Sequence, residues 1–170
     1  MPPTDSTPSP PLLPEGRIVG REDFGAIVRQ ALQTAASEGW QQLLLSDTDF
    51  ADWPLGERAV VEALNAWSRT GRTLQLLARE FDTLRQRHPR FVGWRTTWSH
   101  IVEARACRGA SGEGVPSAIW TPAWTLERID PERSVLVASR SPERKVALRE
   151  RLDAFWLKGS PAFPATVLGL

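Results

Sequence analysis

The stretch "WQQLLLSDTDFADW" (residues 40–53) combines a short apolar run with three aspartates. The apolar run at residues 43–45 predicts a buried strand, and Asp47 and Asp49 follow at its carboxyl end. In an open α/β sheet, ligands bind beyond the carboxyl ends of the strands. Asp47 and Asp49 are therefore either a catalytic acid pair or residues that organise the turn into the next helix.

Helical and extended patterns alternate on both sides of this stretch. Apolar residues at helical spacing, with Gly or Pro near their ends, predict helices at about residues 24–39, 55–69, 80–87 and 141–159. Extended segments are predicted at residues 42–46, 73–78, 91–95, 100–107, 117–121, 124–129 and 134–139, with a hairpin turn at 130–132. We therefore expect an α/β fold, with one layered domain and a mixed sheet flanked by helices.

The N-terminal segment differs in composition from the rest of the chain. Residues 1–14 contain six prolines, with serine and threonine between them. Such a segment cannot bury enough apolar surface to offset the entropy lost on ordering. We expect a disordered Pro-rich tail over residues 1–16 and a single α/β domain over residues 17–170. The Gly/Ser stretch at residues 108–117 is predicted to be a surface loop.

Composition argues against several classes of protein. The formal net charge is +1, so no overall field favours nucleic acid or a membrane surface. The single cysteine, Cys107, excludes an internal disulfide and a multi-cysteine metal site. Membrane-spanning and signal-peptide patterns are missing, and we expect a cytoplasmic protein with no membrane contact. Because dinucleotide-binding and P-loop motifs are also missing, we expect no cofactor and no metal.

An apolar strand followed by D-x-D resembles the nucleophile motif of the haloacid dehalogenase-like phosphatases. The resemblance implies that Asp47 attacks phosphorus, that Asp49 is the acid/base, and that Mg²⁺ lies between acids and substrate. This chemistry also needs a lysine and a second acid pair, yet no lysine precedes Lys145 and no acid pair ends a later strand. Formation of the turn is therefore the preferred interpretation of both aspartates.

A second resemblance extends over most of the chain. From about Glu22 onward, the order of elements around "LLLSDTDF", "RTLQLLARE" and "WTLERIDPERSVLVASRSPERKVALRERLDAFWLKGSP" resembles a degenerate phospholipase D-like half-domain of bacterial proteins. In the active relatives, a strand carries the His and Lys of H-x-K-x-x-x-x-D, and a "GS-x-N" strand follows. Here Trp124 and Leu126 stand in the places of His and Lys, and "VASRS" (residues 137–141) in the place of "GS-x-N". The resemblance implies a pseudoenzyme, a non-catalytic binding or interaction domain.

The middle of the chain is basic. Between Arg72 and Arg108 lie eight arginines but only three acids, with Trp94 and Trp98 among them. Arginine binds phosphate and tryptophan stacks on bases, so nucleic acid or a phosphate ligand is the alternative partner. His100 lacks the motif of the phospholipase D enzymes, because Val102 stands in the place of its lysine. The candidate ligand-binding residues are Asp47, Asp49, Arg85, Arg87, Arg95, His100 and Arg140.

Protein partners are the other possibility. Residues 47–62 carry five acids against one arginine, so opposed acidic and basic patches would suit self-association or a protein partner. Phospholipase D-type half-domains often pair, and the resemblance therefore implies a homodimer. We expect exposed tryptophan surface, for example at Trp120 or Trp124, to supply the contact.

Overall fold

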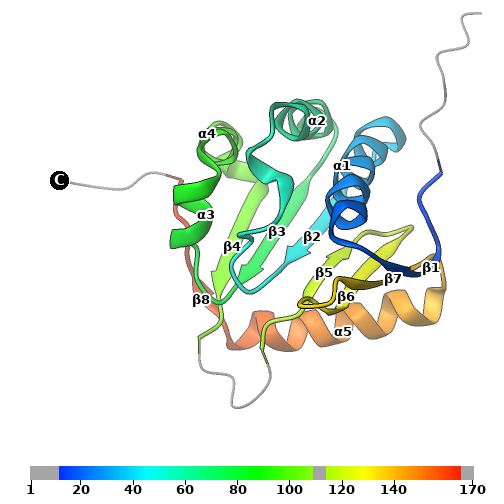
Figure 1. Cartoon of the computed structure of the whole chain (residues 1–170). Coiled ribbons are helices and arrows are strands. Elements are labelled where there is room, and N and C mark those ends of the chain that lie inside the picture. Colours follow the sequence, from blue (N-terminus) through cyan, green and yellow to red (C-terminus); the bar gives the residue numbers. More distant parts are fainter. Residues whose placement is uncertain (1–11, 109–113, 166–170) are drawn as a thin grey trace, which may run out of the picture.

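The computed structural model describes residues 12–108 and 114–165, and its centre is an eight-stranded mixed sheet (Figure 1). The strands lie in the order β1-β7-β6-β5-β2-β3-β4-β8. Residues 1–11, which form most of the predicted tail, and residues 109–113 of the predicted loop are outside the described residues. Leu13 is buried and β1 (Gly16–Val19) begins at Gly16, so the predicted tail reaches into the domain from Leu13 onward, whereas Leu12 is exposed.

Three parallel strands form the half of the sheet that the sequence predicted first. They are β2 (Gln42–Ser46), β3 (Thr73–Ala78) and β4 (Val102–Ala106). β3 pairs with β2 on one side and with β4 on the other, so that Leu45 lies opposite Leu76. Their side chains are mostly buried, as expected for parallel strands covered on both faces.

The other half of the sheet is antiparallel. It contains β5 (Ser117–Trp120), β6 (Thr125–Asp130), β7 (Val135–Ser139) and β1, and the short β8 (Ser160–Pro161) pairs with β4 at the opposite edge. The three strands predicted at residues 117–121, 124–129 and 134–139 are confirmed. The sequence did not predict β1 or β8, because both are exposed strands too short for a pattern.

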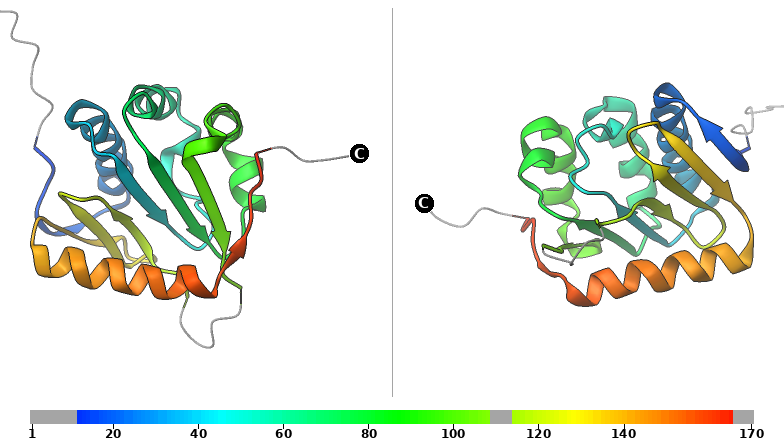
Figure 2. Two further views of the ribbon diagram at one scale, coloured as in Figure 1. Left: turned by 180° about the vertical axis from the view of Figure 1, so that it is seen from behind. Right: turned by 60° about the horizontal axis from the view of Figure 1, so that its bottom comes forward.

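Helices cover both faces of the sheet (Figures 1 and 2). On one face lie α1 (Arg21–Glu38), α2 (Arg58–Ser68), α3 (Asp82–Arg87) and α4 (Pro89–Thr97). α5 (Pro142–Lys158) crosses the other face alone, from the end of β7 to the start of β8 (Figure 2). The α/β class, the mixed sheet and the flanking helices are as the sequence predicted. Ser141 caps α5 as expected, because its Oγ accepts a hydrogen bond from the Arg144 N–H.

One predicted element is wrong. Residues 91–95 were expected to be extended, but they lie within α4. Pro89 ends the preceding helix and also occupies the first turn of α4, where its missing N–H costs nothing. Phe91 and Trp94, three residues apart, are both buried on the face that α4 turns toward the core. No helix within the described ranges is apolar and long enough to cross a membrane.

Candidate functional site

The carboxyl end of β2 carries Asp47 and Asp49, and both carboxylates bind the loop that follows. Asp47 Oδ2 accepts hydrogen bonds from the Asp49 N–H at 3.2 Å and the Phe50 N–H at 2.8 Å. Asp49 Oδ1 accepts one from the Ala51 N–H at 3.0 Å. These bonds hold Phe50 in a left-handed conformation with φ 59°. Both aspartates therefore organise the turn, as the preferred interpretation predicts.

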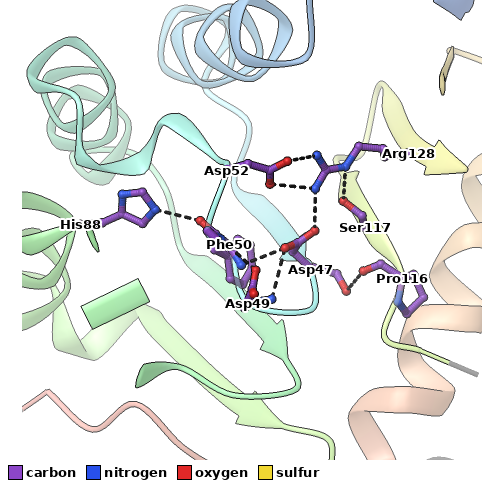
Figure 3. A network of polar contacts seen from close by, with 10 residues as sticks. Asp47, Asp49, Phe50, Asp52, His88, Pro116, Ser117 and Arg128 are labelled. Atoms are coloured by element: carbon purple, nitrogen blue, oxygen red, sulfur yellow. Dashed lines mark hydrogen bonds and ion pairs between the residues drawn. The ribbon is translucent and has the colours of Figure 1, made fainter. Parts of the chain in front are cut away.

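The second oxygen of Asp47 binds an arginine from the far half of the sheet (Figure 3). Arg128 Nη2 donates to Asp47 Oδ1 and to Asp52 Oδ1, both at 3.0 Å. Arg128 Nη1 donates to the other carboxylate oxygen of Asp52. Arg128 Nε donates to Ser117 Oγ at 3.0 Å. The guanidinium also lies 4.2 Å from the centre of the Phe24 ring. We call Asp47, Asp52, Ser117 and Arg128 the Arg128 network. It joins the parallel and antiparallel halves of the sheet.

Burial and charge act in opposite directions inside the Arg128 network. Burial raises the pKa of the Asp52 carboxyl, but the hydrogen bonds and charge of Arg128 outweigh it, so this pKa lies below its ordinary value. Burial lowers the pKa of Arg128, and the two aspartates more than compensate, so that the net shift is upward. The side chains of Asp47 and Arg128 are only 6% and 4% exposed, whereas that of Asp52 is 60% exposed. The network therefore contains a buried ion pair of Asp47 with Arg128, and Arg128 also binds the largely exposed Asp52.

This arrangement does not fit the Mg²⁺ site that the phosphatase resemblance implies. Both oxygens of Asp47 already accept hydrogen bonds, and the Arg128 guanidinium lies where a cation would have to sit. Lys145, which would have to steady the phosphoryl group, donates instead to the Pro122 carbonyl at 2.9 Å. Pro122 follows β5, which runs antiparallel to β2, so Lys145 lies at the opposite end of the sheet from Asp47. In the ranges that the structure describes, no three His, Cys, Asp or Glu side chains are grouped to hold a metal ion.

The other predicted site residues do not converge on Asp47. His100 precedes β4, which runs parallel to β2 and β3, and Arg140 follows β7, which runs antiparallel to β2. Both residues therefore lie at the end of the sheet opposite Asp47, and both are exposed. The centre of the His100 ring lies 5.9 Å from the centre of the Trp98 ring. Arg87, another predicted site residue, is exposed at the end of α3.

Two of the predicted arginines do meet. The guanidinium groups of Arg85 and Arg95 lie 4.9 Å and 5.7 Å from the centre of the Phe163 ring. Arg95 is buried, and its Nε donates to the Phe163 carbonyl at 3.2 Å and its Nη1 to the Ser99 carbonyl at 3.4 Å. Burial and the charge of Arg85 both lower the pKa of Arg95. No carboxylate of the described chain forms an ion pair with either arginine.

Two pockets open at the edge of the sheet where β4 pairs with β8. The larger, of about 580 Å³, is lined by Arg95, Glu103, Arg105 and Trp156, with Pro161 and Ala162. The smaller, of about 340 Å³, is lined by Arg85, Arg108, Asp82 and Phe163, and it shares Ala162 and Pro164 with the larger. We call this region the β4–β8 edge. It collects four of the eight arginines in the basic middle of the chain, two in each pocket.

Sequence reasoning missed the partners in both regions. Arg128 and Asp52 are 76 residues apart, and no local pattern connects them. One signal for the burial of Arg128 was present in "WTLERI". Arg128 follows Leu126 by two residues in a strand, so both side chains point to the same buried face of the sheet. The sequence pattern indicated Trp156 only as an apolar residue of the last helix, and it gave no indication of a role for Phe163. Their role at the β4–β8 edge depends on the position of β8.

The tryptophans expected at a dimer contact are buried within the single chain. Trp120 is 8% exposed and Trp124 is 0% exposed. Trp120 Nε1 donates to the Lys145 carbonyl at 3.1 Å, and Trp124 Nε1 donates to the Pro14 carbonyl at 2.9 Å. The expectation that these side chains supply exposed contact surface is therefore wrong, because α5 and the segment before β1 cover them.

No family model and no curated protein matches the sequence. Solved structures do match the fold. TrmBL2, an archaeal chromatin protein whose structure shows a novel mode of DNA binding, superposes with a TM-score of 0.62 at 12% identity, over 86% of this chain and 53% of that one. This chain thus spans about half the length of TrmBL2. Nuc, a phospholipase D family member from Salmonella typhimurium, superposes with a TM-score of 0.57 at 11% identity, over 86% of this chain and 97% of that one. The fold is phospholipase D-like.

Proposed function

We propose that this chain, which has a phospholipase D-like α/β fold, is a non-catalytic binding domain. The single observation that carries the proposal is the Arg128 network. Asp47 is the acid best placed to be a nucleophile, but its oxygens bind Arg128 and the N–H groups of the loop. A nucleophile must be free to reach the substrate, and Asp47 is not.

The positions of Trp124 and Leu126 support the same proposal. The phospholipase D resemblance puts these residues where the catalytic His and Lys would stand, and both side chains are buried. His88, the other histidine of the chain besides His100, is buried as well, and its Nε2–H donates to the Phe50 carbonyl at 2.8 Å. A buried histidine that holds a loop is poorly placed to act as nucleophile or general base.

The test is hydrolysis of a phosphomonoester and a phosphodiester with and without Mg²⁺, by the natural chain and by Asp47→Asn. We expect no turnover above the level of the variant. A matched control is Asp153→Asn, which removes a half-exposed acid of α5 that pairs with Arg149 and has no described contact with Arg128. Hydrolysis that Asp47→Asn abolishes, while circular dichroism shows the fold retained, would overturn the proposal.

A second candidate function is binding of nucleic acid through the basic middle of the chain. Arg85, Arg95 and Arg105 of the β4–β8 edge favour it, because their described hydrogen bonds and ring contacts are to carbonyls and aromatic rings, and none of them forms an ion pair with a described carboxylate. The similarity in fold to TrmBL2, a DNA-binding protein, adds modest support.

Nucleic-acid binding predicts a strong dependence on salt, because each phosphate contact releases counterions. We expect Arg85→Gln and Arg87→Gln to weaken binding of DNA or RNA and to lower the slope of log K against log salt by about one per contact removed. Arg95 contributes to the same field, but its burial makes a substitution there harder to interpret. Undetectable binding in low salt would remove this candidate and leave a protein partner as the alternative.

A further inference from the structure

The larger pocket of the β4–β8 edge contains a buried positive charge that forms no ion pair with any described carboxylate. Arg95 is 7% exposed, and within the described residues its side chain donates hydrogen bonds only to the carbonyls of Phe163 and Ser99. A buried charge is costly unless an opposite charge compensates it. The charge that acts on Arg95 most directly is that of another arginine, Arg85, which contacts the same Phe163 ring. An anion in this pocket would therefore be stabilised more than at an ordinary arginine on the surface.

A second guanidinium is fixed on the same pocket by neutral groups. Arg105 Nη1 donates to the Trp156 carbonyl at 2.9 Å, and its guanidinium lies 4.9 Å from the centre of the Trp156 ring. These contacts hold the side chain in place before any ligand arrives and leave its other N–H groups without a described partner. Two pre-oriented guanidiniums suit the geometry of a phosphate group.

The rest of the lining restricts the ligand further. Trp156, Pro161 and Ala162 form an apolar wall, and Glu103 brings one carboxylate to the pocket. A ligand that is anionic throughout would be repelled by Glu103. A ligand that has one anionic end and a planar part with N–H donors would satisfy the whole lining. The volume of about 580 Å³ is typical of pockets for a ligand of this size.

We propose that this pocket binds a nucleotide, with its phosphate on Arg95 and Arg105 and its base against the wall that contains Trp156. The nucleotide is either free or part of a strand. The smaller pocket, with Arg85 and Arg108, shares two residues with the larger and would receive the next phosphate of a strand. The proposal rests on the nucleic-acid candidate above for its ligand class.

The test is isothermal titration of the whole 170-residue chain with adenosine 5′-monophosphate, adenosine, inorganic phosphate and a short single-stranded oligonucleotide. We expect the nucleotide to bind more tightly than either of its halves, because phosphate and base contact different walls. Arg105→Gln should weaken nucleotide binding by roughly tenfold, since it removes charge-assisted hydrogen bonds. Arg17→Gln is the matched control, because this exposed arginine lies on β1 at the opposite edge of the sheet from β4 and β8 and should leave binding unchanged.

Two further variants keep the result decisive. Trp156→Leu should reduce nucleotide binding to about the level of inorganic phosphate, because it removes the wall for the base while the backbone carbonyl of residue 156 still holds Arg105. This variant keeps the proposal testable even if Arg105→Gln fails to fold. Arg85→Gln separates the two sources of the ligand. If the physiological ligand is a strand, Arg85→Gln weakens oligonucleotide binding but not mononucleotide binding.

Equal affinity for nucleotide and phosphate, or nucleotide binding that folded Arg105→Gln and Trp156→Leu both retain, would overturn the proposed pocket. Oligonucleotide binding that is unaffected by both variants but lost in Arg87→Gln would overturn this pocket and preserve the nucleic-acid candidate. Hydrolysis of the oligonucleotide would instead overturn the non-catalytic proposal and leave the binding site in place.

Discussion

Two arginines are buried in the described part of this domain, and their surroundings differ. Arg128 binds two carboxylates, one hydroxyl and the face of an aromatic ring. Arg95 binds two backbone carbonyls and lies beside a ring that it shares with Arg85. The charge of Arg128 is compensated by carboxylates of the fold, whereas no described carboxylate pairs with Arg95. This comparison separates a charge that holds the sheet together from a charge that is available to a ligand.

The largest expected effect is at Arg128. Arg128→Met leaves Asp47 buried beside an apolar side chain, and removal of one partner from a buried ion pair costs about 3–5 kcal/mol. Urea denaturation followed by tryptophan fluorescence measures the change. Arg133→Met is the matched control, because Arg133 forms an exposed pair with Asp130 at 3.8 Å and should cost about 0.5 kcal/mol or less. A similar small loss for Arg128→Met would mean that the network does not stabilise the fold.

The next effect is the dependence of stability on pH at Asp52. The pKa of Asp52 is lowered in the folded chain, so its contribution is present above the pKa of the unfolded chain and is lost as pH falls through the folded pKa. Asp52→Asn should cost about 1 kcal/mol at pH 7, because water screens a carboxylate that is 60% exposed. It should also flatten the fall in stability below about pH 4.

Glu57 provides a comparison for this fall in stability at acid pH. Arg29 lowers the pKa of Glu57 by a hydrogen bond, but both side chains of this pair are about 40% exposed. Glu57→Gln should therefore change this fall less than Asp52→Asn does. If Glu57→Gln changed the loss of stability at acid pH more than Asp52→Asn did, the ion pair of Asp52 with Arg128 would not contribute to this loss.

Arg95→Met is the direct counterpart of Arg128→Met and should cost about 1 kcal/mol or less. It loses hydrogen bonds to two carbonyls, but it also removes an uncompensated buried charge and its repulsion of Arg85. The same denaturation experiment gives both values. Equal losses for the two variants would remove the distinction between the two regions.

The smallest effect is expected at Arg85, whose contact in the described chain is the face of the Phe163 ring. Arg85→Gln should change the free energy of unfolding by no more than about 0.5 kcal/mol. Such a variant is suited to binding experiments, because a change in affinity would not reflect a change in folding. A loss above about 1 kcal/mol would place Arg85 among the structural arginines.

Local patterns predicted the elements that depend on local residues. The runs of β2 and β3 are apolar over most of their length, and α1 repeats its apolar residues at helical spacing up to Gly39, so these elements could be recognised without the rest of the fold. α4 was missed because Pro89 was treated only as the end of a helix. β1 was missed because it is an exposed edge strand that requires β7 as a partner.

The candidate site could be predicted only in part, for the same physical reason. The bonds from Asp47 and Asp49 to the turn are local, and the spacing of the two residues indicated them. The bond from Asp47 to Arg128 and the meeting of Arg85 with Arg95 over Phe163 depend on strand order. Charges that become neighbours only through the sheet leave no periodic signal in the sequence.

The pairing of β1 with β7 determines when the antiparallel edge of the sheet can form during synthesis. Gly16 lies opposite Ala138, so residues 16–19 leave the ribosome long before their partner strand exists. Until residues 135–138 have been made, Leu13 and Ile18 must remain outside the core that they later join. Contacts this far apart along the chain slow folding, because a large loop must close before they form. We therefore expect the N-terminal strand to attach late, after the parallel strands and their helices have already folded.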